Sequence, residues 1–238
     1  MSLTSPTPGS RTPAPADSLL TPIRRRSFFM YAGATAGALA FVGCSKSADP
    51  VTVTGPINLG IGDASVLNYA YALEQLEAAF YAQVVKTPAT DFLPGELAYF
   101  TQVAAHEAIH RDFLKAAINR DFAGKLLQNL TPDFSKITFT SRASVLGAAK
   151  TFEDLGVAAY NGAGALLKAA AYLVVAGQIV SVEARHAAFI RDLLAPGSFA
   201  ADDQVDATGL DKQMSPVDVI AAAQAYITEK LDASTVGK

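Results

Sequence analysis

The sequence contains one nine-residue pattern twice, as Glu107–Lys115 (EAIHRDFLK) and as Glu183–Arg191 (EARHAAFIR). Both segments read Glu-Ala-x-His-x-x-Phe, followed by an aliphatic and a basic residue. The Glu and the His of each segment are three residues apart, a spacing that places them on one face of an α-helix. A carboxylate and an imidazole on one helix face converge on a single point, so the pattern predicts two metal-binding helices.

The repeat extends to two more helices, each of which precedes one of these segments. Tyr81 follows Glu74 by seven residues, and Tyr160 follows Glu153 by the same step. Residues at this spacing lie two turns apart on one helix face, so both tyrosines are expected to point inward and to support the ligands by hydrogen bonds across the bundle. Both halves of the chain therefore read Glu…Tyr and then Glu-x-x-His, which a duplicated helical hairpin explains.

Apolar spacing and helix-end signals predict five helical segments. Asp63 is the expected N-cap of the first helix, and Gly162 and Gly164 are expected to end the third. Short connections join the first two helices and the next two, whereas about 20 residues separate the second helix from the third. This pattern predicts an all-α fold, an antiparallel four-helix bundle with one long crossover and an additional short C-terminal helix. The five helices are expected at about residues 63–86, 94–119, 141–163, 167–194 and 216–231.

The predicted metal site uses most of the Glu and His residues of these helices. Four carboxylates and two imidazoles give oxygen-rich ligation with one nitrogen for each of two metal ions, which suits iron or manganese. On otherwise apolar helix faces such groups are costly to bury unless they are paired or bound to metal. The six predicted ligands are Glu74, Glu107, His110, Glu153, Glu183 and His186.

Glu77 is an alternative to Glu74, because the two residues lie on nearly the same face of the first helix. The repeat favours Glu74, since Glu77 aligns with Gly156, which has no side chain to bind a metal. Glu77 is therefore predicted to support the ligands rather than to be one of them. His106 precedes Glu107 and points about 100° away around the helix, so it is expected at the surface or behind a ligand.

The composition is that of one globular domain with an added N-terminal segment. The chain has 238 residues, of which 50% are hydrophobic, and a net charge of −3. This length is enough to bury one sizeable core. The slightly acidic balance argues against nucleic acid as a partner, because nucleic-acid binding needs a basic face. The single Cys excludes an intrachain disulfide framework.

The N-terminal segment has the features of an export signal. Residues 1–22 are rich in Ser, Thr and Pro, and residues 28–43 form a run without charged side chains. The run is short for a membrane-spanning helix but suits a signal peptide. Arg25 and Arg26 precede it in the pattern of the twin-arginine route, which predicts export in a bacterium.

Two cleavage sites compete at the end of this run. Cleavage after Ala40, in Ala38-Leu39-Ala40, fits the ordinary signal peptidase, whereas Phe41-Val42-Gly43-Cys44 resembles a lipobox that lipidates Cys44. Lipidation is favoured because the only Cys of the chain follows the apolar run directly, and it predicts a periplasmic or membrane-anchored lipoprotein. The predicted organisation is a signal region at 1–44, a tether at 45–60, the helical bundle at 61–195, and a loop with the C-terminal helix at 196–238.

At these residues the chain resembles the ferritin-like superfamily of di-iron and di-manganese carboxylate proteins, which includes ferritins, rubrerythrins and manganese catalases. More closely, Val66–Ala70, Phe80–Tyr81 and Tyr160–Ala163 resemble the desiccation-related ferritin-like family, over about residues 60–195. The resemblance implies a ferritin-like bundle that holds two metal ions, and members of that family are often exported.

The expected function is redox chemistry on dioxygen or peroxide outside the cytoplasm, in stress protection. Ferroxidase, peroxidase and catalase reactions are all within reach of two redox-active ions. The alternative is a non-catalytic stress or desiccation-related binding protein that metal ions stabilise. Iron storage ranks third, because a lipid tether and long loops fit a closed cage badly. The sequence assigns no catalytic residue, restricts membrane contact to the lipid anchor, and leaves the oligomeric state open.

Overall fold

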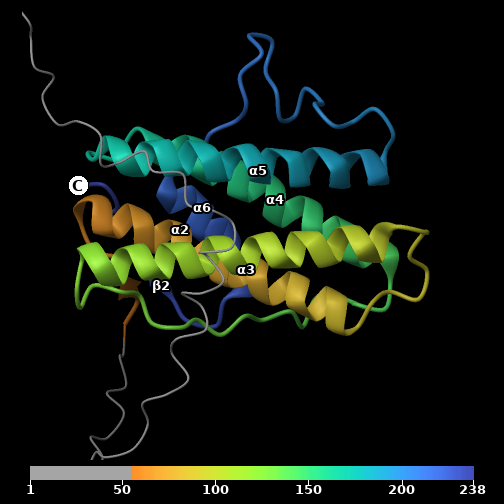
Figure 1. The fold of residues 1–238 in the computed structure, drawn as a ribbon, viewed down its shortest axis with the longest axis horizontal. Helices are drawn as coiled ribbons and strands as arrows, with labels where there is room; N and C mark the ends of the chain where they lie inside the picture. Colours follow the sequence, from red (N-terminus) through yellow and green to blue (C-terminus); the bar gives the residue numbers. More distant parts are fainter. Residues whose placement is uncertain (1–54) are drawn as a thin grey trace, which may run out of the picture. The chain divides into compact units, whose positions relative to one another are not determined.

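The computed structural model of the chain describes residues 55–238, so Arg25, Arg26 and Cys44 lie outside the described part. This part contains four long helices and a short one, whose arrangement is drawn in Figure 1. The prediction of an all-α fold with a short C-terminal helix is confirmed. The helices are α2 (Gly62–Lys86), α3 (Glu96–Asp121), α4 (Arg142–Gly164), α5 (Ala170–Leu194) and α6 (Pro216–Ala223), and the smaller elements are β1 (Ile57–Asn58), the 3₁₀ turn η1 (Gln224–Tyr226) and β2 (Leu231–Asp232).

The four long helices pack as two antiparallel pairs. α2 lies against α3, and Tyr81 near the end of α2 stacks on Phe100 near the start of α3, with ring centroids 6.0 Å apart. α4 lies against α5, and Arg191 near the end of α5 pairs with Asp154 in the middle of α4. Each pair is one of the helical hairpins that the repeat predicts.

The connection between α3 and α4, residues 122–141, runs back along α2. Asn68, near the start of α2, accepts a hydrogen bond from the backbone N–H of Leu127 at 2.9 Å. Gln75, two turns further on, accepts one from Leu130 N, also at 2.9 Å. These amides satisfy the backbone of a segment that has no helix of its own. The connection therefore follows α2 along the bundle, as the predicted crossover requires.

Asp63 does not cap its own helix. Ile61 holds the N-cap position of α2, and Asp63 lies in the first turn. The Asp63 carboxylate instead accepts hydrogen bonds from the backbone N–H groups of Lys168 (2.7 Å) and Ala169 (2.9 Å). Those groups lie at the start of α5, where a helix has no internal acceptor for them. The predicted N-cap thus serves a different helix.

Gly162 does not end its helix, because α4 continues through it to Gly164. Its role is to let another segment approach closely. A Cβ at this position would lie only 1.8 Å from the carbonyl oxygen of Met214. Met214 also donates a backbone hydrogen bond to Ala158 O at 3.0 Å. The end of the loop before α6 therefore docks onto α4 where a glycine leaves room for it.

A parallel pairing of β1 with β2 joins the two ends of the described part. Leu59, directly after β1, is 1% exposed and belongs to the core. The last residues of the segment predicted as a tether therefore belong to the fold. The C-terminal helix is shorter than predicted, since α6 and η1 end at Tyr226 and the chain is extended by Leu231.

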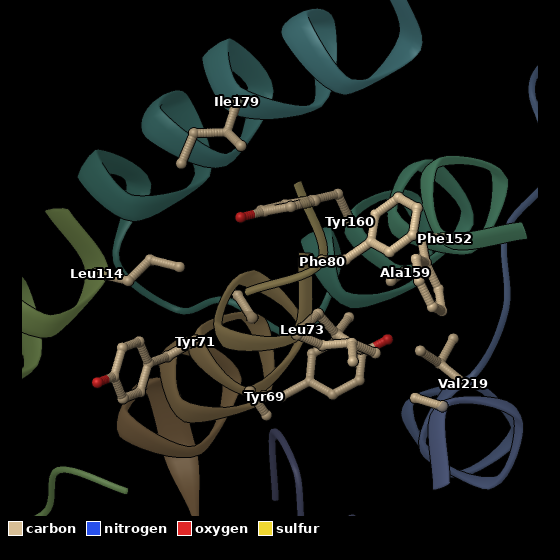
Figure 2. Close-up of a cluster of buried hydrophobic side chains, with 14 of the residues drawn as sticks. Tyr69, Tyr71, Leu73, Phe80, Leu114, Phe152, Ala159, Tyr160, Ile179 and Val219 are labelled. Atoms are coloured by element: carbon tan, nitrogen blue, oxygen red, sulfur yellow. The ribbon is translucent and has the colours of Figure 1, made fainter. Parts of the chain in front are cut away.

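The core between the helices is rich in aromatic side chains. Figure 2 shows Phe80 of α2 beside Phe152 of α4, and their rings meet edge to face with centroids 5.0 Å apart. Such pairs add to the free energy gained by burying apolar area. Val219 of α6 is fully buried at the same cluster, so the C-terminal helix covers this part of the core.

α5 is the one described helix that is long and apolar enough to cross a membrane. It nevertheless buries Glu183, His186 and Ile190 among the other helices. Its first half leaves Leu173 and Val174 exposed. Within the described residues, α5 is therefore built into the bundle and contributes polar groups to its interior.

Candidate metal centre

The structure brings all six predicted ligands together in two overlapping groups, one from each Glu-x-x-His helix with its neighbours. Within each group, the candidate ligand atoms lie within 4.8 Å of one another. Glu107 and Glu183 belong to both groups, as the ligands between two neighbouring ions would. The first group is Glu74, Glu107, His110 and Glu183, and the second is Glu107, Glu153, Glu183 and His186.

The helix pairs produce this convergence. Glu107 and His110 lie on one face of α3, and Glu183 and His186 lie on one face of α5, as their spacing predicts. The four carboxylates are at most 1% exposed, and the His186 and His110 side chains are 5% and 12% exposed. Four carboxylates buried together repel one another, so this arrangement needs compensating positive charge, either as protons or as metal ions.

The imidazoles face the carboxylates at short range. His110 Nδ1 lies 2.8 Å from Glu183 Oε1 and 3.4 Å from Glu107 Oε2. His186 Nδ1 lies 2.9 Å from Glu107 Oε1 and 3.1 Å from Glu183 Oε2. In both histidines the nitrogen that faces the carboxylates is Nδ1, so each imidazole presents the same atom to the centre of the bundle.

Many of these atoms lack hydrogen-bond geometry even where the distances are short. In the described part, seven buried side-chain polar atoms have no hydrogen-bond partner, and six of them belong to this cluster. Native proteins rarely leave buried polar atoms unpaired, so their concentration at one place indicates a missing partner. Oxygen and imidazole nitrogen donors that converge in this way fit iron or manganese. The six atoms are Glu74 Oε2, Glu107 Oε1, Glu107 Oε2, His110 Nδ1, Glu153 Oε2 and Glu183 Oε1.

Without metal, protons balance the charge of the cluster. Burial opposes protonation of His110 and His186, but the surrounding carboxylates outweigh it and raise the pKa of each imidazole to about 12. Burial and the neighbouring Glu107 raise the pKa of Glu153 to about 8. Glu107 is the exception, because the two imidazolium groups overcome its burial and lower its pKa to about 2. The cluster thus binds positive charge strongly, whether as protons or as metal ions.

The two tyrosines of the repeat hold the carboxylates of the opposite half. The Tyr160 hydroxyl donates to Glu74 Oε1 at 2.5 Å, and the Tyr81 hydroxyl donates to Glu153 Oε1. Burial and the adjacent carboxylate raise the pKa of each tyrosine well above its usual value, so both hydroxyls keep their protons and remain donors. Each of these two Glu residues is thereby fixed on one oxygen, while its other oxygen faces the cluster.

Glu77 lies beside the cluster and belongs to neither group. It is 4% exposed, and a Cβ at Gly156 would lie 3.0 Å from Glu77 Oε1. The two positions that align in the repeat therefore face each other, and the glycine leaves space for the carboxylate. Burial and the neighbouring carboxylates, Glu153 first among them, raise the pKa of Glu77 well above its usual value.

His106 is the residue that the sequence did not assign to a definite role. Its Nδ1 lies 2.9 Å from His186 Nε2, and the two rings are nearly parallel, at 10°. His186 is therefore held by His106 on one nitrogen, while the other nitrogen faces the carboxylates. The Tyr99 hydroxyl adds a hydrogen bond to the backbone oxygen of His186 at 3.1 Å. The contact joins α3 to α5, so spacing along one helix could not reveal it.

The family model of the ferritin-like domain matches residues 62–196, which are more than half of the chain. The chain therefore belongs to the ferritin-like family. The matched segment contains all six converging residues and the four long helices that carry them. No curated protein matches the chain. The family and the two buried groups together define a ferritin-like bundle with a candidate dinuclear site.

Proposed function

We propose that the two groups hold two iron or manganese ions and that this centre performs redox chemistry on dioxygen or peroxide. The observation that carries the proposal is the overlap of the two groups at Glu107 and Glu183, which supports two neighbouring metal positions. When bound, two such ions exchange two electrons with dioxygen or peroxide.

The chain's own residues would divide the work of binding. Glu107 and Glu183 would bridge the two positions, because each belongs to both groups. Glu74 and Glu153 would be terminal ligands, each held by a tyrosine hydroxyl from the opposite half. The near-complete burial of the carboxylates keeps bulk water away, which strengthens their electrostatic interaction with bound cations.

The balance of the proposed reaction needs no further cofactor. With hydrogen peroxide as the oxidant, its reduction to two water molecules would take two protons and the two electrons that a bound pair of divalent ions would supply. With dioxygen, the same two electrons and two protons produce hydrogen peroxide. Reduction of the oxidised ions by a second peroxide molecule, or by another electron donor, would return the centre to its starting state.

The test is oxidation of the loaded protein. Protein loaded with Fe(II) or Mn(II) without oxygen is mixed with dioxygen or hydrogen peroxide, while metal oxidation and loss of the oxidant are followed. We expect oxidation faster than that of the free ion, and its loss in Glu107→Ala. Asp202→Ala, which removes an exposed carboxylate, is the matched control. A protein that binds metal and gains thermal stability, but does not accelerate oxidation, would be the non-catalytic stress protein instead.

We also propose that the protein is exported by the twin-arginine route and anchored through Cys44 in a bacterial envelope, where the centre would act in stress protection. The sequence pattern of the N-terminal segment supports this proposal. That route carries folded proteins, so a centre loaded with metal in the cytoplasm would stay intact during export. The desiccation-related subfamily is the proposed relative within the ferritin-like family.

A further inference from the structure

An apolar cavity lies about one helical turn from the metal groups. It has a volume of about 40 Å³, and its walls come from α2, α3, α4 and α5. Leu114 follows His110 by four residues, and Ile179 precedes Glu183 by four residues, a step of about one turn. Tyr160, whose hydroxyl donates to Glu74, also lines the cavity, so its ring stands between the cavity and the carboxylates. Figure 2 shows Leu114, Ile179 and Tyr160 around this space.

The chemistry of the walls selects a small apolar molecule. The lining side chains are aliphatic or aromatic, apart from a single glycine, and the three tyrosines among them (Tyr69, Tyr160 and Tyr172) leave the surface that faces the cavity almost entirely apolar. A cavity of this kind stays dry, because water or hydrogen peroxide would lose hydrogen bonds on entering it. A volume of about 40 Å³ is well below the ~150 Å³ of an apolar cavity that takes benzene, so aromatic rings and long alkyl chains do not fit. Dioxygen is apolar, diatomic and a substrate of the proposed reaction.

A surface groove adjoins the cavity. A groove of about 260 Å³ between α3 and α5 shares Phe113, Val175 and Ile179 with the cavity wall. His110 lines the same groove, and Phe113 is 44% exposed. The groove and the cavity therefore adjoin between these two helices, and Gln178 and His110 are the polar residues of the groove.

In the other half of the repeat, larger side chains stand at two positions equivalent to cavity-lining alanines. Phe100 and Ala176 each lie seven residues before the Glu of their helix, and Phe100 is fully buried against Tyr81. Val84 and Ala163 each follow the repeat tyrosine by three residues. Two alanines of the cavity wall, Ala163 and Ala176, thus stand where the first half of the repeat has valine and phenylalanine.

We infer that this cavity is a dioxygen-binding site that supplies the metal centre. The supply role rests on the proposed function, whereas binding of a small apolar molecule does not. The repeat suggests a substitution that would fill the cavity. Ala176→Phe introduces the residue that stands at the equivalent position of the other half. Ala163→Val is a milder second variant on the same principle. Ala222→Phe adds the same aromatic side chain at an exposed position of α6, away from the cavity, and is the control.

Binding is tested with krypton as an apolar probe. Crystals of the metal-loaded protein under krypton pressure should show a peak between Leu114, Tyr160 and Ile179. The peak should disappear in Ala176→Phe, or in Ala163→Val if the larger side chain prevents folding, and should remain in Ala222→Phe. Absence of the peak from the unmodified protein would overturn the inference, and this result does not depend on whether the centre is redox active.

The role of the cavity in supplying dioxygen to the metal centre is tested by comparing two oxidants. Ala176→Phe and Ala163→Val should oxidise their bound Fe(II) several-fold more slowly with dioxygen. With hydrogen peroxide their rate should be unchanged, because this polar molecule is not expected to enter a dry cavity. Equal slowing with both oxidants, or an unchanged dioxygen rate, would refute the supply role. Failure of the unmodified protein to react with either oxidant would instead contradict the proposed function. The krypton peak would still show whether the cavity binds a small apolar molecule.

Discussion

At the scale of single residues, the proposed metal centre would have to exchange protons for metal ions. The pKa of His110 and of His186 is raised to about 12, and that of Glu153 to about 8. Each of these groups binds protons more tightly in the folded chain than at its ordinary pKa of 6.5 for His or 4.5 for Glu. Metal binding has to displace these protons, so metal affinity should increase with pH.

The same shifts predict how the stability of the metal-free protein depends on pH. A group with a raised pKa stabilises the folded state below its unfolded value, and this stability is lost as the pH rises through the folded value. The free energy of unfolding of the metal-free protein should therefore fall between about pH 5 and pH 8. The contribution of Glu107 to the free energy of unfolding changes with pH in the opposite direction. Because its pKa is lowered to about 2, this change occurs at lower pH.

Thermal melts of chelated and metal-loaded protein across this range provide the measurement. The metal-loaded protein should lose less stability with rising pH, because bound cations replace the protons. Glu153→Gln should flatten the dependence in the metal-free protein, since it removes one group with a raised pKa. A metal-free protein that becomes more stable from about pH 5 to about pH 8 would show that the cluster is not held by protons.

His106 provides a second prediction at this scale. Its contact with His186 fixes the orientation of that imidazole, and supports of this kind typically change metal affinity by ~10–100-fold. His106→Ala should weaken mainly the group that contains His186 and leave the group of His110 nearly intact. Metal titration monitored by calorimetry measures this difference. Gln102→Ala, at an exposed position one turn earlier on α3, is the control, and equal affinities in the two variants would contradict the assignment.

The residues of the cluster could be found in the sequence because the repeat marks them twice. Glu74 was distinguished from Glu77 only by its alignment with Glu153, and the structure places Glu74 in a ligand group and Glu77 beside it. The His106 contact could not be found in this way. It depends on the distance between α3 and α5, which no spacing within α3 encodes.

At the scale of helices, the close approach at Gly162 gives a prediction with a control in the same helix. Gly162→Ala would place a methyl group against the Met214 carbonyl, so it should destabilise the protein by about 1–3 kcal/mol, as overpacking does. Gly147, also in α4, is exposed, and a Cβ added there would meet no atom within 4 Å. Gly147→Ala should instead stabilise by up to ~1 kcal/mol through helix propensity.

Urea unfolding of the two variants measures both changes. Opposite signs are expected, because the substitution is the same and only the surroundings differ. If Gly162→Ala were as stable as the unmodified protein, the loop before α6 would not be docked on α4 as described.

The helices themselves were predictable because their apolar spacing and end signals are local. The helix ends that the sequence predicts wrongly depend on tertiary contacts. Gln224 donates its side-chain amide to Ile227 O and Glu229 O and accepts from Leu231 N, so it closes a turn that ends the C-terminal helix early. Similarly, Asp63 looks like an N-cap in the sequence but is used by the start of α5.

At the scale of the whole molecule, the N-terminal segment predicts where the protein acts. Replacing both Arg25 and Arg26 by Lys should trap the precursor in the cytoplasm, because the twin-arginine route reads that pair. Cys44→Ser should release the protein from the membrane fraction. Cell fractionation of a tagged full-length chain measures both effects. Unchanged export would indicate a general secretory signal, and a mature N-terminus at Phe41 would show cleavage after Ala40 without lipidation.

The central claim is that one bundle holds two metal ions through six side chains, and elemental analysis of the purified full-length protein tests it most directly. After loading with iron or manganese, we expect two ions per chain. Glu107→Ala or Glu183→Ala should lose both ions, because each residue belongs to both groups, whereas Glu74→Ala or Glu153→Ala should lose mainly one. A protein that retains no metal after loading, or that loses it in Glu77→Ala but not in Glu74→Ala, would contradict the account.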